Sequence, residues 1–256
     1  MGTGTQKRPS KSQFDLRRVL QYERWRFPIK KVYRPLIEGK RGIEVGGPSV
    51  VFDAVLPLYQ FIGDLDGVNF ASDTIWEGHI DADAGYRYSD QGRGRQFISD
   101  ATDLITVSTG VYDFMLSSNC LEHVANPLKA MREWRRVLTS DGVLVLVLPN
   151  QKHNFDHRRP VTAFEHLLDD FARNTGEDDL THLDEILALH DLSMDKPAGN
   201  LAQFRERSLA NFDNRTLHHH IFDLPLIMKL LDHMEFDVLH TARTRSDFFA
   251  LARKRN

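Results

Sequence analysis

Apolar positions along the chain fall into short continuous runs, separated by stretches in which they recur every three or four residues. The runs predict five successive strands, at residues 41–45, 59–64, 96–99, 112–118 and 143–148. The last run contains no polar residue, which is typical of a strand covered on both faces in a parallel sheet. Strands that alternate with helices join through right-handed crossovers, so the pattern predicts a doubly wound α/β fold.

Helical signals lie between these runs and on either side of them. They predict helices at residues 14–27, 50–58, 126–140 and 223–234. Asn126 and Asp223 each stand just before a proline in the first turn, where a missing N–H costs nothing. Residues 235–241 and 247–252 then predict two strands joined by a short turn, a closing hairpin on an otherwise parallel sheet.

This rhythm divides the chain into four predicted parts. They are a leader and helix at residues 1–40, with 1–11 expected to be disordered, a core at 41–150, a helical insertion at 151–220, and a return to the core at 221–256. The insertion is acidic and holds eight of the twelve histidines, with helices expected around 162–173 and 182–190. It follows the fifth strand, and open α/β folds bind ligands at that edge of the sheet.

The composition excludes several classes of protein. A net charge of −3 and a pI near 6.5 leave no large basic surface, so nucleic acid is not expected as a partner. Cys120 is the single cysteine, which excludes an intramolecular disulfide and fits a reducing compartment. No run approaches the ~20 apolar residues that cross a bilayer. We therefore expect a soluble, cytoplasmic protein of one domain with additions.

The turn after the first strand has the chemistry of a ligand-binding strand end. Glu44 is followed by Gly46, Gly47, Pro48 and Ser49. Two glycines let the backbone approach a bound group without a Cβ in the way, and Pro48 can open the next helical turn. The same residue types are also ordinary turn formers, so the motif gains weight only from the strands that follow.

Acidic residues stand at two further predicted strand ends. Asp66, preferred over Asp64, follows the second strand and could accept hydrogen bonds from both hydroxyls of a ribose, with an Asp-Gly turn as the alternative. Asp100 follows the third strand. It could bond the exocyclic amine of an adenine, or it could cap the next helical turn.

These residues resemble the motifs of class I S-adenosylmethionine-dependent methyltransferases. The resemblance covers about residues 41–150 and rests on 43–47, Asp66, 100–101, 112–114, 121–124, 134–138 and 141–142. It implies a Rossmann-like, mostly parallel sheet of seven strands with a closing antiparallel hairpin strand, and S-adenosylmethionine as the cofactor. The commonest first motif has Gly-x-Gly after the acid, whereas this chain has adjacent glycines before Pro48. The resemblance therefore implies the site but not the detailed path of its loop.

The resemblance also implies individual roles at the cofactor. Glu44, Gly46 and Gly47 would lie along its methionine and ribose parts, and Asp66 would take the ribose hydroxyls. Asp100 and Ala101 would face the adenine. Ser117, Ser118 and Asn119 would line the end of the fourth strand beside the methionine group.

The insertion carries a narrower resemblance. Residues 154–162, 165–171 and 218–220 are similar to segments of bacterial methyltransferases that modify sugars and polysaccharides, some of which cap methylated mannose polysaccharides. This resemblance implies O-methylation of a sugar or oligosaccharide hydroxyl, in polysaccharide biosynthesis.

Such a reaction needs a base in the insertion. Methyl transfer from a sulfonium is an in-line displacement, so the protein must position the nucleophile and remove its proton. His153 comes four residues after Pro149, at the exit of the fifth strand, and is the first candidate for the general base. A surface loop histidine is the alternative. Asp156 and His218 complete the predicted catalytic set.

The other histidines of the insertion suggest ligands for a metal or for the acceptor. His218 and His220 would point to the same side of an extended segment and could join Asp156 around Mg²⁺ or another divalent metal, although Mg²⁺ prefers oxygen ligands. The predicted acceptor-binding residues are His123, His157, Arg158 and His220. The residues expected to hold the insertion together through buried hydrogen bonds are His166, Asp170, His182 and Glu185.

Other functions remain open at this point. A methyltransferase for another small-molecule hydroxyl, of a lipid or secondary metabolite, fits the same motifs, and so does a catalytically silent binding module with this fold. A metal-dependent hydrolase would use the His/Asp-rich insertion, but the chain has no His-Glu-x-x-His motif. A nicotinamide dehydrogenase is less favoured, because Gly-x-Gly-x-x-Gly is absent after the first strand. A homodimer is the working hypothesis for assembly.

Overall fold

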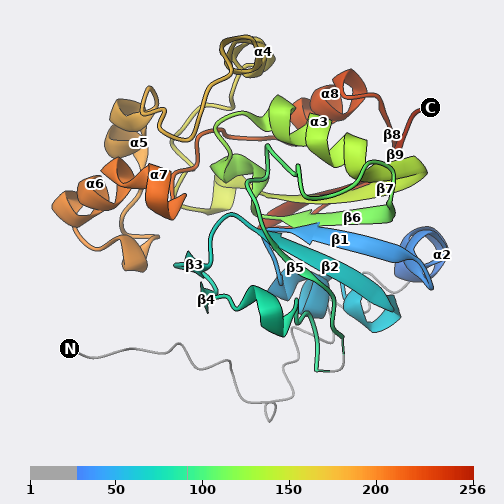
Figure 1. The fold of residues 1–256 in the computed structure, drawn as a ribbon. Helices are drawn as coiled ribbons and strands as arrows, with labels where there is room; N and C mark the ends of the chain where they lie inside the picture. The colour runs from blue at the N-terminus through green and yellow to red at the C-terminus, as the bar shows by residue number, and fades with distance from the viewer. Residues whose placement is uncertain (1–27, 91) are drawn as a thin grey trace.

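A seven-stranded sheet forms the centre of the protein. The structure is a computed structural model and describes residues 28–90 and 92–256. The strands lie in the order β5 (Gln96–Ile98), β2 (Asp64–Asn69), β1 (Arg41–Val45), β6 (Tyr112–Ser118), β7 (Leu138–Pro149), β9 (Asp247–Lys254) and β8 (Phe236–Arg243) (Figure 1). β9 is antiparallel to both of its neighbours, and all other pairs in this sheet are parallel. The predicted fold class, with its closing hairpin, is confirmed.

The register aligns the strand ends along one edge of the sheet. Val45 of β1 pairs with Val68 of β2 and with Ser117 of β6, and Ser117 pairs with Leu146 of β7. The residues that follow β1, β2 and β6 therefore leave the sheet side by side, as in other open α/β sheets that bind ligands at this edge.

Both faces of the sheet are covered. α3 (Pro127–Val137) and α8 (Leu224–His233) pack on one face, where Trp134 and Leu230 are fully buried. The other face buries Tyr33 and Phe52 beneath α2 (Arg34–Ile37) and three short turns, at Ile29–Tyr33, Val51–Val55 and Tyr59–Phe61. α3 begins where predicted, because the Asn126 side chain accepts a hydrogen bond from the Lys129 amide.

The segment between β7 and α8 is helical. It contains α4 (Phe164–Arg173), α5 (Leu183–Leu189), α6 (Leu201–Leu209) and α7 (Asn211–Asn214). α4 packs near α3 and α8, whereas α5, α6 and α7 lie beyond the carboxyl ends of the strands (Figure 1). A two-stranded hairpin, β3 (Asp73–Thr74) and β4 (Gly78–His79), lies on that same side of the sheet (Figure 1). Of these helices, α6 and α7 were not predicted.

Several local predictions were wrong. The second strand is Asp64–Asn69 rather than 59–64, and the predicted helix at 50–58 is a single turn, Val51–Val55, that ends before Pro57. Pro57 cannot continue helical hydrogen bonds, and Tyr59 and Ile62 pack from a separate turn onto the sheet. α3 ends at Val137, because Leu138 already pairs with Tyr112 as the first residue of β7.

Two expectations concern other parts of the chain. The predicted leader at residues 1–11 and the predicted helix at 14–27 lie outside the described residues. Within residues 28–90 and 92–256, no helix combines the length and apolar character that a bilayer-spanning segment needs.

Candidate active site

A cleft of about 420 Å³ opens where the strand ends meet the helical segment. Strand ends and the turns after them contribute Val45, Gly46, Ser49, Val50, Val51, Val68, Asn69, Phe70, Ser99, Asp100, Ala101, Ser118, Asn119, Cys120 and Pro149. The connections and the insertion contribute Thr74, Trp76, Glu77, Glu122, His123, Val124, Asn154, Phe155, Glu177, Arg215 and His218. The volume lies in the range of roughly 300–1,000 Å³ that is typical of small-molecule sites.

The glycine turn reaches this cleft, but Glu44 does not. Gly46 lines the cleft with a φ of +80°, a left-handed conformation that favours glycine. Glu44 is fully buried below the turn, where its carboxylate accepts hydrogen bonds from the hydroxyls of Tyr59 and Tyr86, both at 2.7 Å, and from the Ser49 amide at 3.1 Å. Burial raises the pKa of Glu44 to about 7, although these hydrogen bonds oppose the rise. The prediction that Glu44 faces the cofactor is therefore corrected: it holds the turn.

Gly47 also belongs to the support of the turn rather than to the lining of the cleft. A Cβ at this position would overlap the Glu44 carboxyl group and the Tyr86 hydroxyl. Its carbonyl oxygen accepts a hydrogen bond from the Asn69 side chain at 3.0 Å. Glycine is needed here so that the turn can close over Glu44.

Asp66 lies away from the strand end. It pairs with Ile43 in the first half of β2, and its carboxylate accepts hydrogen bonds from the Tyr112 hydroxyl at 2.6 Å and the Arg95 amide at 2.7 Å. The ribose prediction for Asp66 is therefore wrong, because the second strand continues past Asp66 and ends at Asn69. Asn69 and Phe70 line the cleft at the true end of β2.

Another carboxylate reaches the cleft from the connection after β2. Glu77, between β3 and β4, lines the cleft beside Trp76. Sequence reasoning missed it, since it lies in an irregular Gly/Asp/Tyr-rich stretch; the pair Trp76-Glu77 within that polar loop was the available signal.

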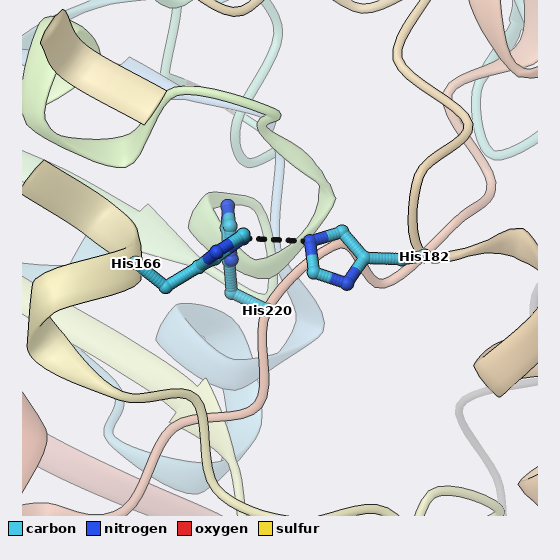
Figure 2. Close-up of side chains that lie close together, drawn as sticks. All are labelled: His166, His182 and His220. Carbon is cyan, nitrogen blue, oxygen red and sulfur yellow. Dashed lines mark hydrogen bonds between the residues drawn. The ribbon is translucent and has the colours of Figure 1, made fainter. Parts of the chain in front are cut away.

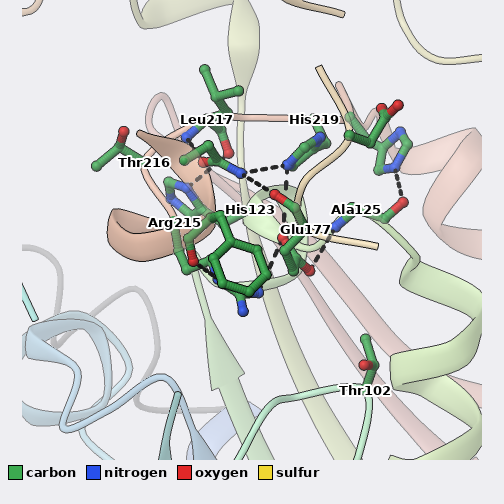
Figure 3. A network of polar contacts seen from close by, with 12 residues as sticks. Thr102, His123, Ala125, Glu177, Arg215, Thr216, Leu217 and His219 are labelled. Atoms are coloured by element: carbon green, nitrogen blue, oxygen red, sulfur yellow. Dashed lines mark hydrogen bonds and ion pairs between the residues drawn. The ribbon is translucent and has the colours of Figure 1, made fainter. Parts of the chain in front are cut away.

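Asp100 and Ala101 line the cleft, and the Asp100 carboxylate has two kinds of partner. Its Oδ1 accepts a hydrogen bond from the Thr102 amide at 2.8 Å, which is the capping alternative, and its Oδ2 lies 3.0 Å from the Arg215 guanidinium. Arg215 also pairs with Glu177 at 3.2 Å (Figure 3). Sequence analysis did not identify Arg215, which joins the insertion to the end of β5.

The end of β6 and the turn after it contribute residues to the cleft. Ser118 and Asn119 line it, whereas Ser117 is fully buried and points to the other side, so the prediction for Ser117 is corrected. The Ser118 hydroxyl is buried and has no hydrogen-bond partner among the described residues. It is therefore available to a bound ligand.

Glu122, His123 and His218 form a polar group in the cleft. One ligand-type atom from each lies within 4.8 Å of the others, so this set could also hold a cation. Glu122 is 1% exposed, its carboxylate oxygens have no hydrogen-bond partner among the described residues, and burial raises its pKa to about 7. His123 donates from Nδ1 to the Leu217 carbonyl at 3.1 Å (Figure 3), and burial lowers its pKa.

His218 is paired with a buried carboxylate. Its Nδ1 lies 2.6 Å from Asp156 Oδ2, and the other Asp156 oxygen lies 3.3 Å from Arg159. Burial lowers the pKa of His218, but the charge and hydrogen bond of Asp156, together with the charge of Glu122, outweigh it and the net shift is upward. Burial acts to raise the pKa of Asp156, yet His218 and Arg159 lower it to about 2. Asp156 is thus an anion that orients the His218 ring.

Five of the predicted catalytic or acceptor-binding residues do not line the cleft: Asp156, which pairs with His218, and His153, His157, Arg158 and His220. His153 is exposed at the end of the turn Gln151–His153, so its assignment as base is corrected. His157 and Arg158 are also exposed, and both lie against Asp191. His220 is buried and donates from Nε2 to the Ala125 carbonyl at 3.2 Å.

The predicted metal set does not form. Asp156 is hydrogen-bonded to His218, whereas His220 belongs to a separate group with His166 and His182. His218 and His220 do not meet at one site, because the first ring pairs with Asp156 and the second with the Ala125 carbonyl. As expected, His166, His182 and Glu185 contribute contacts within the insertion: His166 contacts His182 at 2.9 Å, and Glu185 contacts Arg159 at 2.9 Å.

The chain is similar to known proteins both in sequence, over part of its length, and in fold. Residues 77–146 match the model of a methyltransferase domain family. A protein of Listeria monocytogenes classed as an S-adenosylmethionine-dependent methyltransferase has the same fold, with a TM-score of 0.50, 12% identity, and coverage of 91% of this chain and 98% of that one. No curated protein sequence matches the chain.

Two further structures are similar at lower scores. The 1,6-didemethyltoxoflavin-N1-methyltransferase of Burkholderia thailandensis, with bound 1,6-didemethyltoxoflavin and S-adenosylhomocysteine, has a TM-score of 0.47, 13% identity and coverage of 98% and 93%. A Haloferax volcanii methyltransferase in complex with the Trm112 activator has a TM-score of 0.48, 12% identity and coverage of 94% and 95%. Residues 77–146 thus match a methyltransferase-domain family, and the Listeria monocytogenes protein shows that the chain has the fold of S-adenosylmethionine-dependent methyltransferases.

Proposed function

We propose that the protein is an O-methyltransferase that transfers the methyl group of S-adenosylmethionine to a hydroxyl of a sugar or oligosaccharide. One observation carries the proposal: the His218 ring, oriented by buried Asp156, lines the same cleft as the strand ends of the methyltransferase fold. The proposed base and the proposed cofactor site thus lie in one cleft, whose volume is typical of small-molecule sites.

The strand ends support cofactor binding. Gly46 allows close approach of the backbone, and Ser118 offers a buried hydroxyl without a protein partner among the described residues. Asp100 and Ala101 would face the adenine, and Asn119 would lie beside the methionine group. We assign the ribose hydroxyls to Glu77, in place of Asp66, because it is an acid that lines the cleft near β2. S-adenosylmethionine supplies the electrophilic methyl group.

His218 acts as the general base in this proposal. Asp156 accepts the hydrogen bond of Nδ1–H, which leaves the lone pair of Nε2 for the proton of an acceptor hydroxyl. Such a base contributes roughly 10²–10⁴ in rate. His123 and Glu122 lie close enough to hold neighbouring hydroxyls of the acceptor. If a cation assists instead, these two residues and His218 are the ligands that it would use.

The surroundings of the base favour a sugar-like acceptor. Trp76 lies with its ring centroid 5.3 Å from that of His123, and Phe155 lies 5.0 Å from His218. Aromatic faces beside convergent polar groups suit a ligand that has both apolar C–H faces and several hydroxyls. The hydroxyl of a lipid or secondary metabolite is the alternative that an acceptor screen would separate.

The test has two stages. Calorimetric titration with S-adenosylhomocysteine should show one-to-one binding, and absence of binding would leave the fold as a silent binding module. A panel of mono- and oligosaccharides, lipids and phenolic hydroxyls is then assayed for methylated product by mass spectrometry, with and without added Mg²⁺. Methylation of the non-sugar compounds alone would refute the acceptor class, and dependence on Mg²⁺ would support the metal-assisted form.

A further inference from the structure

A second group of histidines lies outside the cleft, inside the helical segment. His166 comes from α4, His182 immediately precedes α5, and His220 comes from the extended segment before α8. Figure 2 shows that the three rings converge although they come from three separate parts of the chain. One nitrogen of each lies within 4.8 Å of the others, and the Nε2 atoms of His166 and His182 are 2.9 Å apart.

The buried member of this group has an unused lone pair. His220 is 1% exposed and its Nε2 donates to the Ala125 carbonyl, so Nδ1 is the nitrogen without a proton. Nδ1 has no hydrogen-bond partner among the described residues. A buried acceptor without a partner destabilises the fold, and a bound cation would remove that cost.

The carboxylate of Asp170 lies beside the three histidines. Asp170 Oδ2 lies 3.2 Å from His166 Nε2 and 3.6 Å from His220 Nε2. This oxygen is buried and makes no hydrogen bond of good geometry within the described residues, whereas Oδ1 accepts a hydrogen bond from Thr175. Three imidazoles therefore meet beside one negative charge.

We propose that His166, His182 and His220 bind one Zn²⁺ or a similar transition-metal ion, with Asp170 as the neighbouring negative charge. Imidazole is a preferred ligand of zinc, whereas Mg²⁺ and Ca²⁺ prefer oxygen. Two nitrogens at about 2.0–2.1 Å from a tetrahedral ion are about 3.3 Å apart, so the 2.9 Å between His166 and His182 needs only a small opening.

The metal would have a structural task. It would tie together α4, the start of α5 and the segment that carries His218 into the cleft two residues before His220. Phe164 and Leu167 of α4 belong to the main core, whereas Ile186 of α5 belongs to a separate small cluster with Leu217, so neither apolar cluster joins α4 directly to α5. The site is distinct from Glu122, His123 and His218, and the inference does not depend on the methyl acceptor.

The test measures metal binding by the full chain. Protein treated with a chelator and then dialysed is titrated with Zn²⁺ by calorimetry, its melting temperature is followed with and without the ion, and Co²⁺ absorption reports the ligand geometry. We expect one tight equivalent, a higher melting temperature with metal, and d–d bands of a tetrahedral or five-coordinate Co²⁺ site.

Two variants locate the ion. His182→Gln should lower zinc affinity by at least about 100-fold and abolish the thermal shift. His157→Gln makes the same change at an exposed histidine outside the group and should behave as the wild type. Absence of stoichiometric binding would overturn the proposal, as would loss of binding in His123→Gln together with its retention in His182→Gln.

Discussion

Asp156→Asn tests the proposed base most directly. The Asp156 carboxylate lies between the Nδ1–H of His218 and the guanidinium of Arg159. Arg159 can only donate hydrogen bonds, so the side-chain oxygen of the introduced asparagine should turn toward it and the amide NH₂ toward His218. His218 would then accept at Nδ1 and carry its proton on Nε2, which leaves no lone pair for the acceptor hydroxyl.

The size of the effect follows from the loss of a positioned base. We expect kcat to fall by roughly 10²–10⁴, which corresponds to about 3–5 kcal/mol in the barrier. Removing one member of a buried ion pair also costs about 3–5 kcal/mol of stability. Arg159 keeps Glu185 at 2.9 Å and the His218 carbonyl at 2.7 Å, so the variant should fold with a lower melting temperature.

The assay separates these two effects. Turnover is measured with the acceptor found in the screen, while S-adenosylhomocysteine titration and circular dichroism confirm that the variant is folded and binds the cofactor. Asp191→Asn is the matched control, because it makes the same change beside exposed Arg158, away from the cleft. A folded Asp156→Asn variant with kcat within a few-fold of wild type would refute the role of the pair.

Substitutions at three further positions test other parts of the structure. Glu77→Gln should raise the Kd for S-adenosylhomocysteine by about tenfold through loss of a charged acceptor, and an unchanged titration would remove Glu77 from the cofactor site. Glu44 has a pKa raised from 4.5 to about 7 in the folded state, so its stabilising contribution is complete below about pH 4.5 and is lost as the pH rises through 7. Urea unfolding at pH 5 and pH 8 should therefore show that wild type loses about 2.5 kcal/mol more than Glu44→Gln, and parallel curves would contradict the burial of a titrating carboxyl group. Arg215→Met should lower the unfolding free energy by roughly 3 kcal/mol, with Arg215→Lys intermediate because lysine cannot bridge Asp100 and Glu177 as a fork; equal melting temperatures for all three would show that the bridge does not stabilise the fold.

Much of the fold was present in local sequence patterns. The apolar runs of β6 and β7, the glycine turn after β1, the start of α3 at Asn126 and the closing hairpin were all predicted, since each depends on periodicity or turn chemistry within a few residues. The likeness to S-adenosylmethionine-dependent methyltransferases came from the same local motifs.

Prediction of the site was only partly correct, because side-chain direction depends on register and on contacts distant in sequence. Because the second strand continues to Asn69, Asp66 lies inside the sheet and not at the strand end. Side chains alternate along β6, so Ser117 is fully buried whereas Ser118 lines the cleft. Glu44 kept its place on β1 but was enclosed by tyrosines that come from later segments.

The sequence by itself determined the order of strands and helices, the ligand-binding edge and the wealth of histidines in the insertion, because these follow from periodicity and composition. Only the tertiary structure decided which histidines meet. His218 pairs with Asp156 across 62 positions of sequence, and His166, His182 and His220 converge from three segments. Contacts of this kind are set by how the helices pack beyond the sheet, and no spacing along the chain encodes them.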